Sequence, residues 1–356
     1  MNAASLARPE IASLSPYAAA AQEHLTVRLN ANEVPWNPLG STDESLNRYP
    51  QIRPWTLRDR LAEVYGVAAP QLLVTRGTSE AIDLLIRVFC RAGQDNVVIT
   101  PPTFGMYKVY ADIQGAGLHT APLNAEQDFN FDVPALLRVS DDHSKLIFIC
   151  TPNNPTGNSI HASNLEKLIS ARQGRSLIVV DEAYFEFSAG VSAVTLMDRF
   201  DNLVVLRTLS KAHGLAAARL GCVLAQPVVI KLLDSIMAPY SVATAIANRA
   251  MTALADDNLA LAAIRIKQLI GERGRLMNRL STRESVEKVW PSNANFLLVR
   301  FRDLPGTRAF LESRKILIRD FSAAPGLQNC ARITVGSCSE NDLLLDTLDE
   351  MSRSYA

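Results

Sequence analysis

Short, wholly apolar runs alternate with helix-like stretches from about residue 72 of this chain. Strands without polar alternation are typical of sheets covered on both faces, and intervening helices are typical of parallel connections. The pattern therefore predicts an α/β fold with a large, mostly parallel but mixed sheet. The shorter gap between the last two runs predicts one reversed strand. The runs are LLVT (72–75), VVIT (97–100), KLIFIC (145–150), SLIVVD (176–181), NLVVLRTLS (202–210) and RLGCVLA (219–225).

The C-terminal third has a different pattern, with long helices followed by strands and helices of a smaller α+β unit. At 356 residues a single core is less favoured than two, since cores stop growing at roughly 250 to 300 residues. We expect an N-terminal arm at 1–45, a large domain at 46–250 and a small domain at 251–356. The proline-rich arm is expected to pack on the small domain or on another subunit. The expected helices are 242–256, 258–281, 306–314 and 339–353, and the expected strands are 286–290, 295–301, 316–320 and 331–336.

Composition argues against several classes of partner. The 36 Lys and Arg residues balance the 36 Asp and Glu residues, so no excess charge favours nucleic acid. No apolar run reaches the roughly 20 residues of a membrane helix, and the N-terminus lacks the pattern of a signal peptide. The five cysteines form no C-x-x-C pair and the five histidines no H-E-x-x-H motif. We therefore expect a cytoplasmic protein without a metal site, a disulfide framework or a membrane partner.

Two of four polar motifs at predicted strand ends are a glycine turn and a proline-rich turn. In TRGTSE (75–80), Gly77 precedes a helix whose free amides suit a phosphate, although an ordinary helix cap by Thr78 or Ser79 is the commoner meaning of such a sequence. In TPNNPTG (151–157), the rigid turn can direct an amide side chain into a cleft, but Asn and Pro are also common turn residues.

The other two motifs carry charge. In VVDEAY (179–184), Asp181 ends a buried strand, where its carboxylate needs a cationic partner such as a ring nitrogen or an arginine. In TLSKAHG (208–214), Lys211 lies in a loop of small residues, where lost solvation would lower its pKa and make it a nucleophilic amine. A surface lysine is the alternative interpretation.

Together and in this order, the motifs resemble the fold type I pyridoxal-phosphate aminotransferases of class II, and among them the histidinol-phosphate aminotransferases. The resemblance runs almost end to end and rests on the set, because each motif alone is weak. Its segments are LSPY (14–17), LNANE (29–33), RYP (48–50), RGTSEAIDLLIR (76–87), PPTFGMY (101–107), TPNNPTG, VVDEAYFEF (179–187), RTLSKAHGLA (207–216), IRD (318–320) and ARITVG.

The resemblance implies a role for each residue around the ring of the cofactor, pyridoxal 5′-phosphate. Lys211 would form the Schiff base and, once the substrate displaces it, carry the proton of the reaction. Asp181 would keep the pyridine nitrogen protonated. Tyr184 and Asn154 would hydrogen-bond the phenolic oxygen, and Phe104 would stack on the ring.

The cofactor phosphate has its own implied set, in which Gly77 allows close approach. The implied contacts are the amides of Thr78 and Ser79, the hydroxyls of Thr208 and Ser210, the guanidinium of Arg219, and Tyr49. Tyr49 would come from the neighbouring subunit, so the resemblance also implies a homodimer.

For the substrate, the resemblance implies that Arg332 in ARITVG binds the α-carboxylate through a bidentate contact. Arg319, Tyr17 and Tyr240 match positions at the phosphate end of histidinol phosphate. Structural alternatives are a surface ion pair of Arg319 with Asp320 and plain interface packing of the two tyrosines.

The sequence departs from the family pattern at three places. Phe104 stands where tyrosine is frequent, which keeps the stacking and loses a phenolic hydrogen bond. Thr78 and Ser79 replace the Ala-Asp of some relatives, so the contacts of their side chains are in doubt but those of their amides are not. His213 replaces a common aromatic residue and is interpreted as part of the pocket wall rather than as a catalyst.

The implied reaction is amino transfer from glutamate to imidazole-acetol phosphate, giving L-histidinol phosphate and 2-oxoglutarate, a step of histidine biosynthesis. An aromatic or broad-range aminotransferase is the nearest alternative, since fold does not determine substrate. A phosphoamino acid decarboxylase would use the same lysine and arginine. A fourth hypothesis is a regulator that binds the cofactor but has no catalytic activity. This hypothesis is disfavoured by the presence of Lys211, Asp181, Tyr184 and Arg332.

Overall fold

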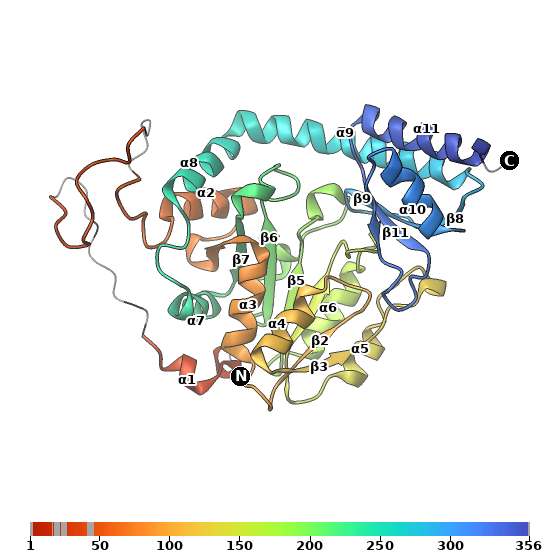
Figure 1. The fold of residues 1–356 in the computed structure, drawn as a ribbon. Helices are drawn as coiled ribbons and strands as arrows, with labels where there is room; N and C mark the ends of the chain where they lie inside the picture. Colours follow the sequence, from red (N-terminus) through yellow and green to blue (C-terminus); the bar gives the residue numbers. More distant parts are fainter. Residues whose placement is uncertain (1–2, 16, 18–21, 23–26, 41–45, 355–356) are drawn as a thin grey trace.

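The computed structural model describes residues 3–15, 17, 22, 27–40 and 46–354, so part of the expected N-terminal arm lies outside the described residues. The described chain forms a seven-stranded sheet and a four-stranded sheet, each with its own helices (Figure 1). None of the described helices is long and apolar enough to cross a membrane.

The seven-stranded sheet has the order β1-β7-β6-β5-β4-β2-β3. β7 runs antiparallel to both of its neighbours, and the remaining pairs are parallel, which confirms the mixed α/β sheet and its reversed strand. β3 was not predicted, because this edge strand is largely exposed and lacks an apolar run. The strands are β1 (Leu72–Thr75), β2 (Asn96–Ile99), β3 (Gly117–Thr120), β4 (Ser144–Cys150), β5 (Leu177–Asp181), β6 (Leu203–Thr208) and β7 (Gly221–Ala225).

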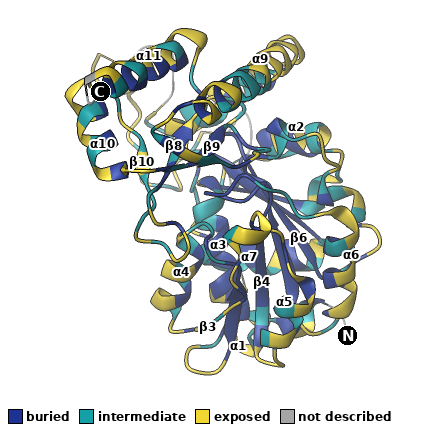
Figure 2. Ribbon diagram, turned by 90° about the vertical axis from the view of Figure 1, so that its right-hand side faces the viewer, coloured by how far each residue is buried: buried dark blue, intermediate teal, exposed yellow. Residues whose placement is uncertain are grey.

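Helices cover both faces of this sheet, which explains the continuous apolar strands. Ile147 and Ile149 of β4 pack into one core with α2, α5 and α6, and Leu146 and Phe148 pack into the other with α3, α4 and α7. Figure 2 shows the buried strands between helices whose outer faces are exposed. The helices are α2 (Trp55–Tyr65), α3 (Gly77–Phe89), α4 (Met106–Gln114), α5 (Val133–Val139), α6 (Ala162–Ala171), α7 (Pro227–Ile236) and α8 (Thr244–Ala253).

The four-stranded sheet has the order β10-β11-β9-β8 and is antiparallel throughout. Its core packs against α9, α10 and α11. The strand expected at 316–320 is shorter than predicted, because only Arg319 and Asp320 pair and Leu317 is 81% exposed. The elements are β8 (Val286–Val289), β9 (Phe296–Phe301), β10 (Arg319–Asp320), β11 (Cys330–Thr334), α9 (Asp256–Ser281), α10 (Leu304–Ser313) and α11 (Cys338–Ser354).

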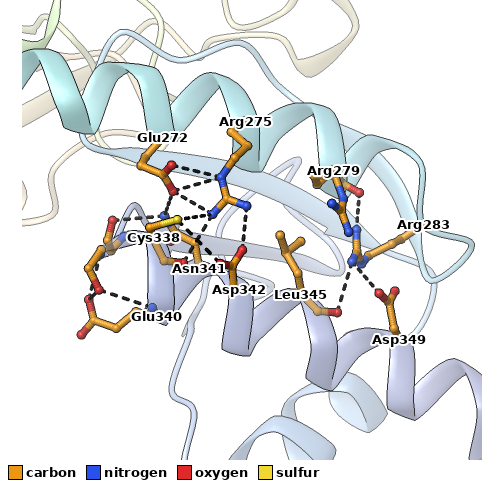
Figure 3. A network of polar contacts seen from close by, with 12 residues as sticks. Glu272, Arg275, Arg279, Arg283, Cys338, Glu340, Asn341, Asp342, Leu345 and Asp349 are labelled. Carbon is orange, nitrogen blue, oxygen red and sulfur yellow. Dashed lines mark hydrogen bonds and ion pairs between the residues drawn. The ribbon is translucent and has the colours of Figure 1, made fainter.

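A polar network joins α9 to α11 on the outside of the small unit (Figure 3). Arg275 of α9 contacts Glu272 on its own helix and Asp342 of α11 at 2.6 Å. Just beyond the end of α9, Arg283 donates to Asp349 of α11 at 2.9 Å. The charges are partly exposed, so each pair contributes modestly and the network mainly fixes the register of the two helices.

The first described residues pack on the large unit, a contact that the sequence did not predict. η1 (Ala3–Leu6) and α1 (Pro9–Ala12) lie against α7, and the Arg8 amide donates to the Val88 carbonyl at the end of α3 at 3.0 Å. The expected boundary between residues 250 and 251 falls inside α8. The other short helices are η2 (Ala69–Gln71), η3 (Ala125–Gln127), η4 (Phe185–Phe187), η5 (Ala193–Leu196) and η6 (Ala216–Ala218).

Candidate active site

The carboxyl ends of parallel strands β4, β5 and β6 lie side by side and open into one cavity. Ligands of open α/β sheets bind at this edge. Most of the predicted cofactor-binding residues line the cavity, so segments far apart in the sequence meet there. The lining residues are Thr78, Ser79, Phe104, Cys150, Asn154, Asp181, Ala183, Tyr184, Thr208, Ser210, Lys211 and Arg219.

One end of the cavity is suited to a phosphate. Helix α3 begins at Gly77, so the amides of Thr78 and Ser79 lie in its first turn, where no intrahelical partner exists. Gly77 has a φ of +73°, and a Cβ there would lie 2.7 Å from Nη2 of Arg219. Only glycine therefore lets the guanidinium approach this helix terminus. A Cβ on Gly221 would lie 2.8 Å from the Thr78 nitrogen, so the neighbouring strand is equally close.

The loop that precedes Lys211 is held by its own hydroxyl groups. Thr208 Oγ1 donates to the Leu220 carbonyl at 3.1 Å and accepts from the Ser210 amide at 3.1 Å. The Thr208 hydroxyl thus shapes the loop as well as lining the cavity. The Ser210 hydroxyl accepts a long contact of 3.5 Å from Arg219, whose Nη1 also donates to the Ala216 carbonyl at 3.1 Å.

Lys211 lies in the open part of the cavity, with its Nζ 5.6 Å from the centre of the Tyr184 ring. Solvent reaches the side chain through the cavity mouth, yet the surrounding protein still lowers its pKa. Partial burial is the main cause, and the nearby guanidinium groups of Arg332 and Arg219 add to it, while Asp181 opposes it. A lysine with a lowered pKa has more of its amine uncharged near neutral pH, and the uncharged amine is the form that attacks a carbonyl or accepts a proton, as expected for this position.

Asp181 is only 2% exposed, and its carboxylate is held by uncharged donors. The Tyr107 hydroxyl donates to Oδ2 at 2.8 Å, and the Ala183 amide donates to Oδ1 at 3.1 Å. Among the described side chains, no Lys or Arg forms an ion pair with Asp181. Burial raises its pKa to about 6 and outweighs the two hydrogen bonds, which lower it. The site therefore has a buried anion that lacks a cation.

Sequence reasoning missed Tyr107. The only signal was its place three residues after Phe104 in PPTFGMY; Phe104 precedes α4, and Tyr107 lies in the first turn of that helix. The contact with Asp181 spans 74 positions of the chain.

The raised pKa of Asp181 predicts a pH-dependent cost of folding in the cofactor-free protein. The folded state binds the proton more tightly than the unfolded state, so this carboxyl destabilises the fold increasingly as pH rises from about 4 to about 6. A shift of roughly two pKa units corresponds to about 3 kcal/mol. We expect Asp181→Asn to raise the free energy of unfolding by about 3 kcal/mol at pH 7.5 and by about half of that at pH 5.

Urea denaturation of the cofactor-free proteins at both pH values measures this difference. Asp346→Asn, at an exposed carboxylate, is the control and should change little at either pH. A gain for Asp181→Asn that is the same at pH 5 and pH 7.5 would contradict the expected titration.

Tyr184 and Asn154 approach the cavity from the two loops after β5 and β4. Both are buried, and burial raises the pKa of Tyr184 above its ordinary value. Asn154 Oδ1 accepts a 2.5 Å hydrogen bond from Nη1 of Arg332. This bond engages the amide oxygen, so the amide nitrogen is available to donate to a ligand.

Arg332 of β11 brings the small sheet to the cavity. Its guanidinium lies over the rings of Phe296 and Phe321, at 5.3 and 5.5 Å from the ring centres. Burial lowers the pKa of Arg332, and the charge of Arg319 lowers it further. Two aromatic contacts and the bond to Asn154 thus hold a planar donor beside the predicted cofactor site.

Arg319 lies directly opposite Arg332 in the β10–β11 pair. Like charges at opposed positions are unfavourable unless an anion lies between them. Asp320 does not pair with Arg319, because its carboxylate accepts from Arg308 at 2.7 Å. The surface ion pair considered from the sequence is therefore absent from the described residues, and Arg319 remains exposed.

The two units are joined next to these residues. The Asn293 amide donates to the Gly157 carbonyl at 2.7 Å, and a Cβ on Gly157 would lie 2.4 Å from the Ser292 hydroxyl. Arg273 of α9, which the sequence analysis also missed, donates to the carbonyls of Phe187 and Ala294 at 3.0 and 2.8 Å. These bonds fix the loop before β9 against both active-site loops.

Six predicted site residues are outside the set that lines the cavity within one chain, namely Gly77, Arg319, Arg332, Tyr17, Tyr49 and Tyr240. Tyr17 and Tyr49 are 66% and 51% exposed, and the Tyr49 ring stacks on Tyr240 at 4.9 Å. The Tyr49 amide donates to Glu33, which also pairs with Arg48, so LNANE and RYP are joined. His213 is also outside the lining set, so the cavity of this chain does not include it as the wall residue that was expected.

Comparisons with known proteins agree with this geometry. The Aminotransferase class I and II family matches residues 19–348. The histidinol-phosphate aminotransferase of Xanthomonas campestris pv. campestris is 44% identical over 347 residues, which are 96% of each chain.

Solved structures show the same fold. The histidinol-phosphate aminotransferase of Sinorhizobium meliloti in complex with pyridoxal 5′-phosphate superposes with a TM-score of 0.77, at 24% identity over 87% of this chain and 84% of the other. The L-threonine-O-3-phosphate decarboxylase of Porphyromonas gingivalis gives 0.74, at 23% identity over 86% of this chain and 91% of the other. The fold alone therefore does not separate transamination from decarboxylation.

Proposed function

This chain belongs to the Aminotransferase class I and II family, and we propose that it transfers an amino group between L-histidinol phosphate and 2-oxoglutarate. In the other direction the substrates are imidazole-acetol phosphate and glutamate, and the pathway is histidine biosynthesis in the cytoplasm. The observation that carries the proposal is the 44% identity to a histidinol-phosphate aminotransferase along 96% of both chains. The paired arginines Arg319 and Arg332 support it.

The residues of the cavity fit pyridoxal 5′-phosphate, the cofactor of this family. The helix terminus at Gly77 and the guanidinium of Arg219 would hold the phosphate dianion, since both offer positive charge at one end of the cavity. Asp181, a buried carboxylate without a cation, would hold a protonated ring nitrogen. Phe104 would cover the ring face, and Asn154 and Tyr184 would meet the phenolic oxygen.

When bound, the cofactor withdraws electrons from the carbon that bears the amino group and stores that group between the two half-reactions. Lys211 would hold the cofactor and then move the proton of that carbon. Its lowered pKa favours the free amine that this work requires. The same side chain thus serves for binding and for proton transfer.

Arg319 and Arg332 would bind the anionic groups of two different substrates. Glutamate carries an α-carboxylate that histidinol phosphate lacks, and histidinol phosphate carries a phosphate. Arg332 reaches Asn154 beside the cofactor site, whereas Arg319 is exposed on the adjacent strand. We infer that Arg332 binds the anion next to the reacting carbon and that Arg319 meets the more distant phosphate.

A steady-state comparison of histidinol phosphate with phenylalanine, each with 2-oxoglutarate, tests this function. We expect the specificity constant for histidinol phosphate to be the higher of the two. A clear preference for phenylalanine would favour the aromatic aminotransferase. Release of carbon dioxide from O-phosphothreonine without amino transfer would favour the decarboxylase. A protein that binds the cofactor but shows neither activity would favour a silent regulator.

We also propose a homodimer in which Tyr49 completes the neighbouring site. Large apolar side chains are exposed among the described residues of the arm and of the segment from residue 46 to the start of α2, and Figure 1 shows the arm away from both sheets. Such a concentration of exposed apolar surface is typical of a subunit interface. The side chains are Val27, Leu29, Val34, Trp36, Leu39, Leu46, Tyr49 and Trp55.

Mixed dimers of Lys211→Ala and Tyr49→Ala subunits test the shared site. If Tyr49 acts across the interface, each mixed dimer has one intact site, and a random mixture should regain about a quarter of wild-type activity. Each parent protein alone should have far less. If the activity of the mixture equals the average of the two parents, Tyr49 acts within its own subunit. If sedimentation shows a fully active monomer at the assay concentration, the shared site is excluded.

A further inference from the structure

Tyr107 is completely buried in the first turn of α4, and its phenol reaches the end of β5. Its hydroxyl donates to Asp181 Oδ2 at 2.8 Å. Its ring stacks on Phe148 of β4 at 4.7 Å with an interplanar angle of 14°. It also meets the Phe104 ring edge-on at 5.6 Å and 85°. One side chain therefore contacts two of the residues predicted to surround the cofactor ring, Asp181 and Phe104.

The charges around Asp181 make this contact important. Lys211, on the loop after β6, favours the ionised carboxylate from a distance, while Glu182, the residue after Asp181, disfavours it. Cys150 on β4 and Tyr184 after β5 are also close but are neutral groups, because burial raises the pKa of each. The direct partners are thus the Tyr107 hydroxyl and the Ala183 amide, both uncharged.

We propose that Tyr107 is a positioning residue of the transamination centre, which keeps Asp181 ionised and aimed at the cofactor ring nitrogen and supports Phe104 against the ring face. The inference rests on the proposed placement of the cofactor between Phe104 and Asp181. It assigns to Tyr107 no contact with substrate or cofactor.

The direction of the hydrogen bonds supports this role. A phenol that donates to a carboxylate stabilises the ionised form over the protonated one, and bonds to ionised groups are stronger than bonds between neutral groups. Oδ2 is fixed by Tyr107 and Oδ1 by Ala183, so the carboxylate cannot turn freely. A protonated Asp181 would offer a neutral group to the ring nitrogen and would no longer stabilise its positive charge.

Tyr107→Phe removes this hydroxyl and keeps the stacked ring. We expect the dissociation constant for pyridoxal 5′-phosphate at pH 7.5 to rise roughly 10- to 100-fold, as for the loss of a hydrogen bond to a charged group. On acidification, the variant should also lose affinity at a higher pH than the wild type, because protonation of Asp181 becomes easier. Equilibrium dialysis of the cofactor across pH 5 to 8 measures both effects.

Tyr110→Phe is the matched control, since Tyr110 lies on the same helix, is only half-buried and contacts neither Phe104 nor Asp181 through any hydrogen bond or ring contact among the described residues. Its cofactor affinity and its pH profile should match those of the wild type. Wild-type affinity in Tyr107→Phe at every pH would overturn the inference.

A double-mutant cycle separates this role from a general effect on folding. In an Asp181→Asn background no charge remains to be stabilised, so adding Tyr107→Phe should change the cofactor affinity by less than about threefold. Tyr107→Phe alone leaves the buried charge of Asp181 without one of its hydrogen bonds, which can destabilise the fold. The double variant has no such charge, so its cofactor affinity can be measured even if the single variant is unstable. Equal effects of Tyr107→Phe with and without Asp181 would show a purely structural role. Wild-type protein that bound no cofactor would overturn the proposed function itself.

Discussion

Replacing Lys211 by alanine is expected to abolish transamination, with turnover falling by roughly 10⁴-fold or more. The reason is that one amine is assigned two tasks, attachment of the cofactor and movement of the proton at the reacting carbon. Lys211 is the lysine that lines the cavity, and Asp181 and Arg219 lie near enough to influence its pKa. No neighbouring lysine in the cavity lining is available to replace it. Single-turnover kinetics on cofactor-loaded protein measure the loss.

Borohydride reduction provides the accompanying chemical test. The wild-type protein should retain the cofactor on one peptide, the one that contains Lys211, and Lys211→Ala should retain none. The cofactor should still bind reversibly to the variant, because the helix terminus at Gly77 and the guanidinium of Arg219 are intact. Lys231→Ala, at an exposed lysine of α7, is the control and should behave like the wild type. A label on any lysine other than Lys211 would refute the assignment.

Arg332→Ala should slow both half-reactions, whereas Arg319→Ala should slow mainly the half-reaction of histidinol phosphate. Loss of a charge-assisted bidentate contact costs about 1.5 to 3 kcal/mol or somewhat more, so specificity constants should fall roughly 10- to 1000-fold. Arg332→Ala also removes the donor to Asn154 Oδ1, which lies beside the cofactor. Its effect should therefore be the larger of the two. Single-turnover measurements with glutamate and with histidinol phosphate separate the half-reactions.

Arg302→Ala is the control for this pair, since Arg302 is exposed beyond the end of β9 and donates to the Glu284 carbonyl away from the cavity. Both of its half-reactions should proceed at wild-type rates. Wild-type speed and affinity of Arg319→Ala with histidinol phosphate would remove Arg319 from the site. The phosphate-specific function would then lose its main structural support.

The sequence alone predicted the large sheet, because its strands are buried on both faces and so have no polar alternation. It also predicted most of the cavity lining, since Asp181 ends a strand, Asn154 and Lys211 lie in the loops that follow two other strands, and the ends of parallel strands meet. Gly77 was predicted for a local reason as well, because close approach to a helix terminus requires a residue without a side chain. These features depend on residues that are close together in the chain, so the local sequence pattern is enough to predict them.

Contacts between distant segments were decided only by the tertiary structure. The bond of Arg332 to Asn154 spans 178 positions, and that of Tyr107 to Asp181 spans 74. The buried ion pair of Arg207 with Glu182, next in sequence to Thr208 and Asp181, likewise joins two strand ends without any local signal. The places of Tyr17, Tyr49 and Tyr240 outside the cavity of their own chain are of the same kind.

The physical reason is that a side chain's own sequence window determines its burial and its strand or helix, but not its partner. The apolar run of β5 predicted a buried carboxylate at Asp181 that must be satisfied. Whether a cation, an amide or a phenol satisfies it depends on which helix packs over that strand end. Here α4 packs against β2 and β3, and its Tyr107 side chain stacks on Phe148 of β4 and brings its hydroxyl to Asp181, which only the folded chain shows.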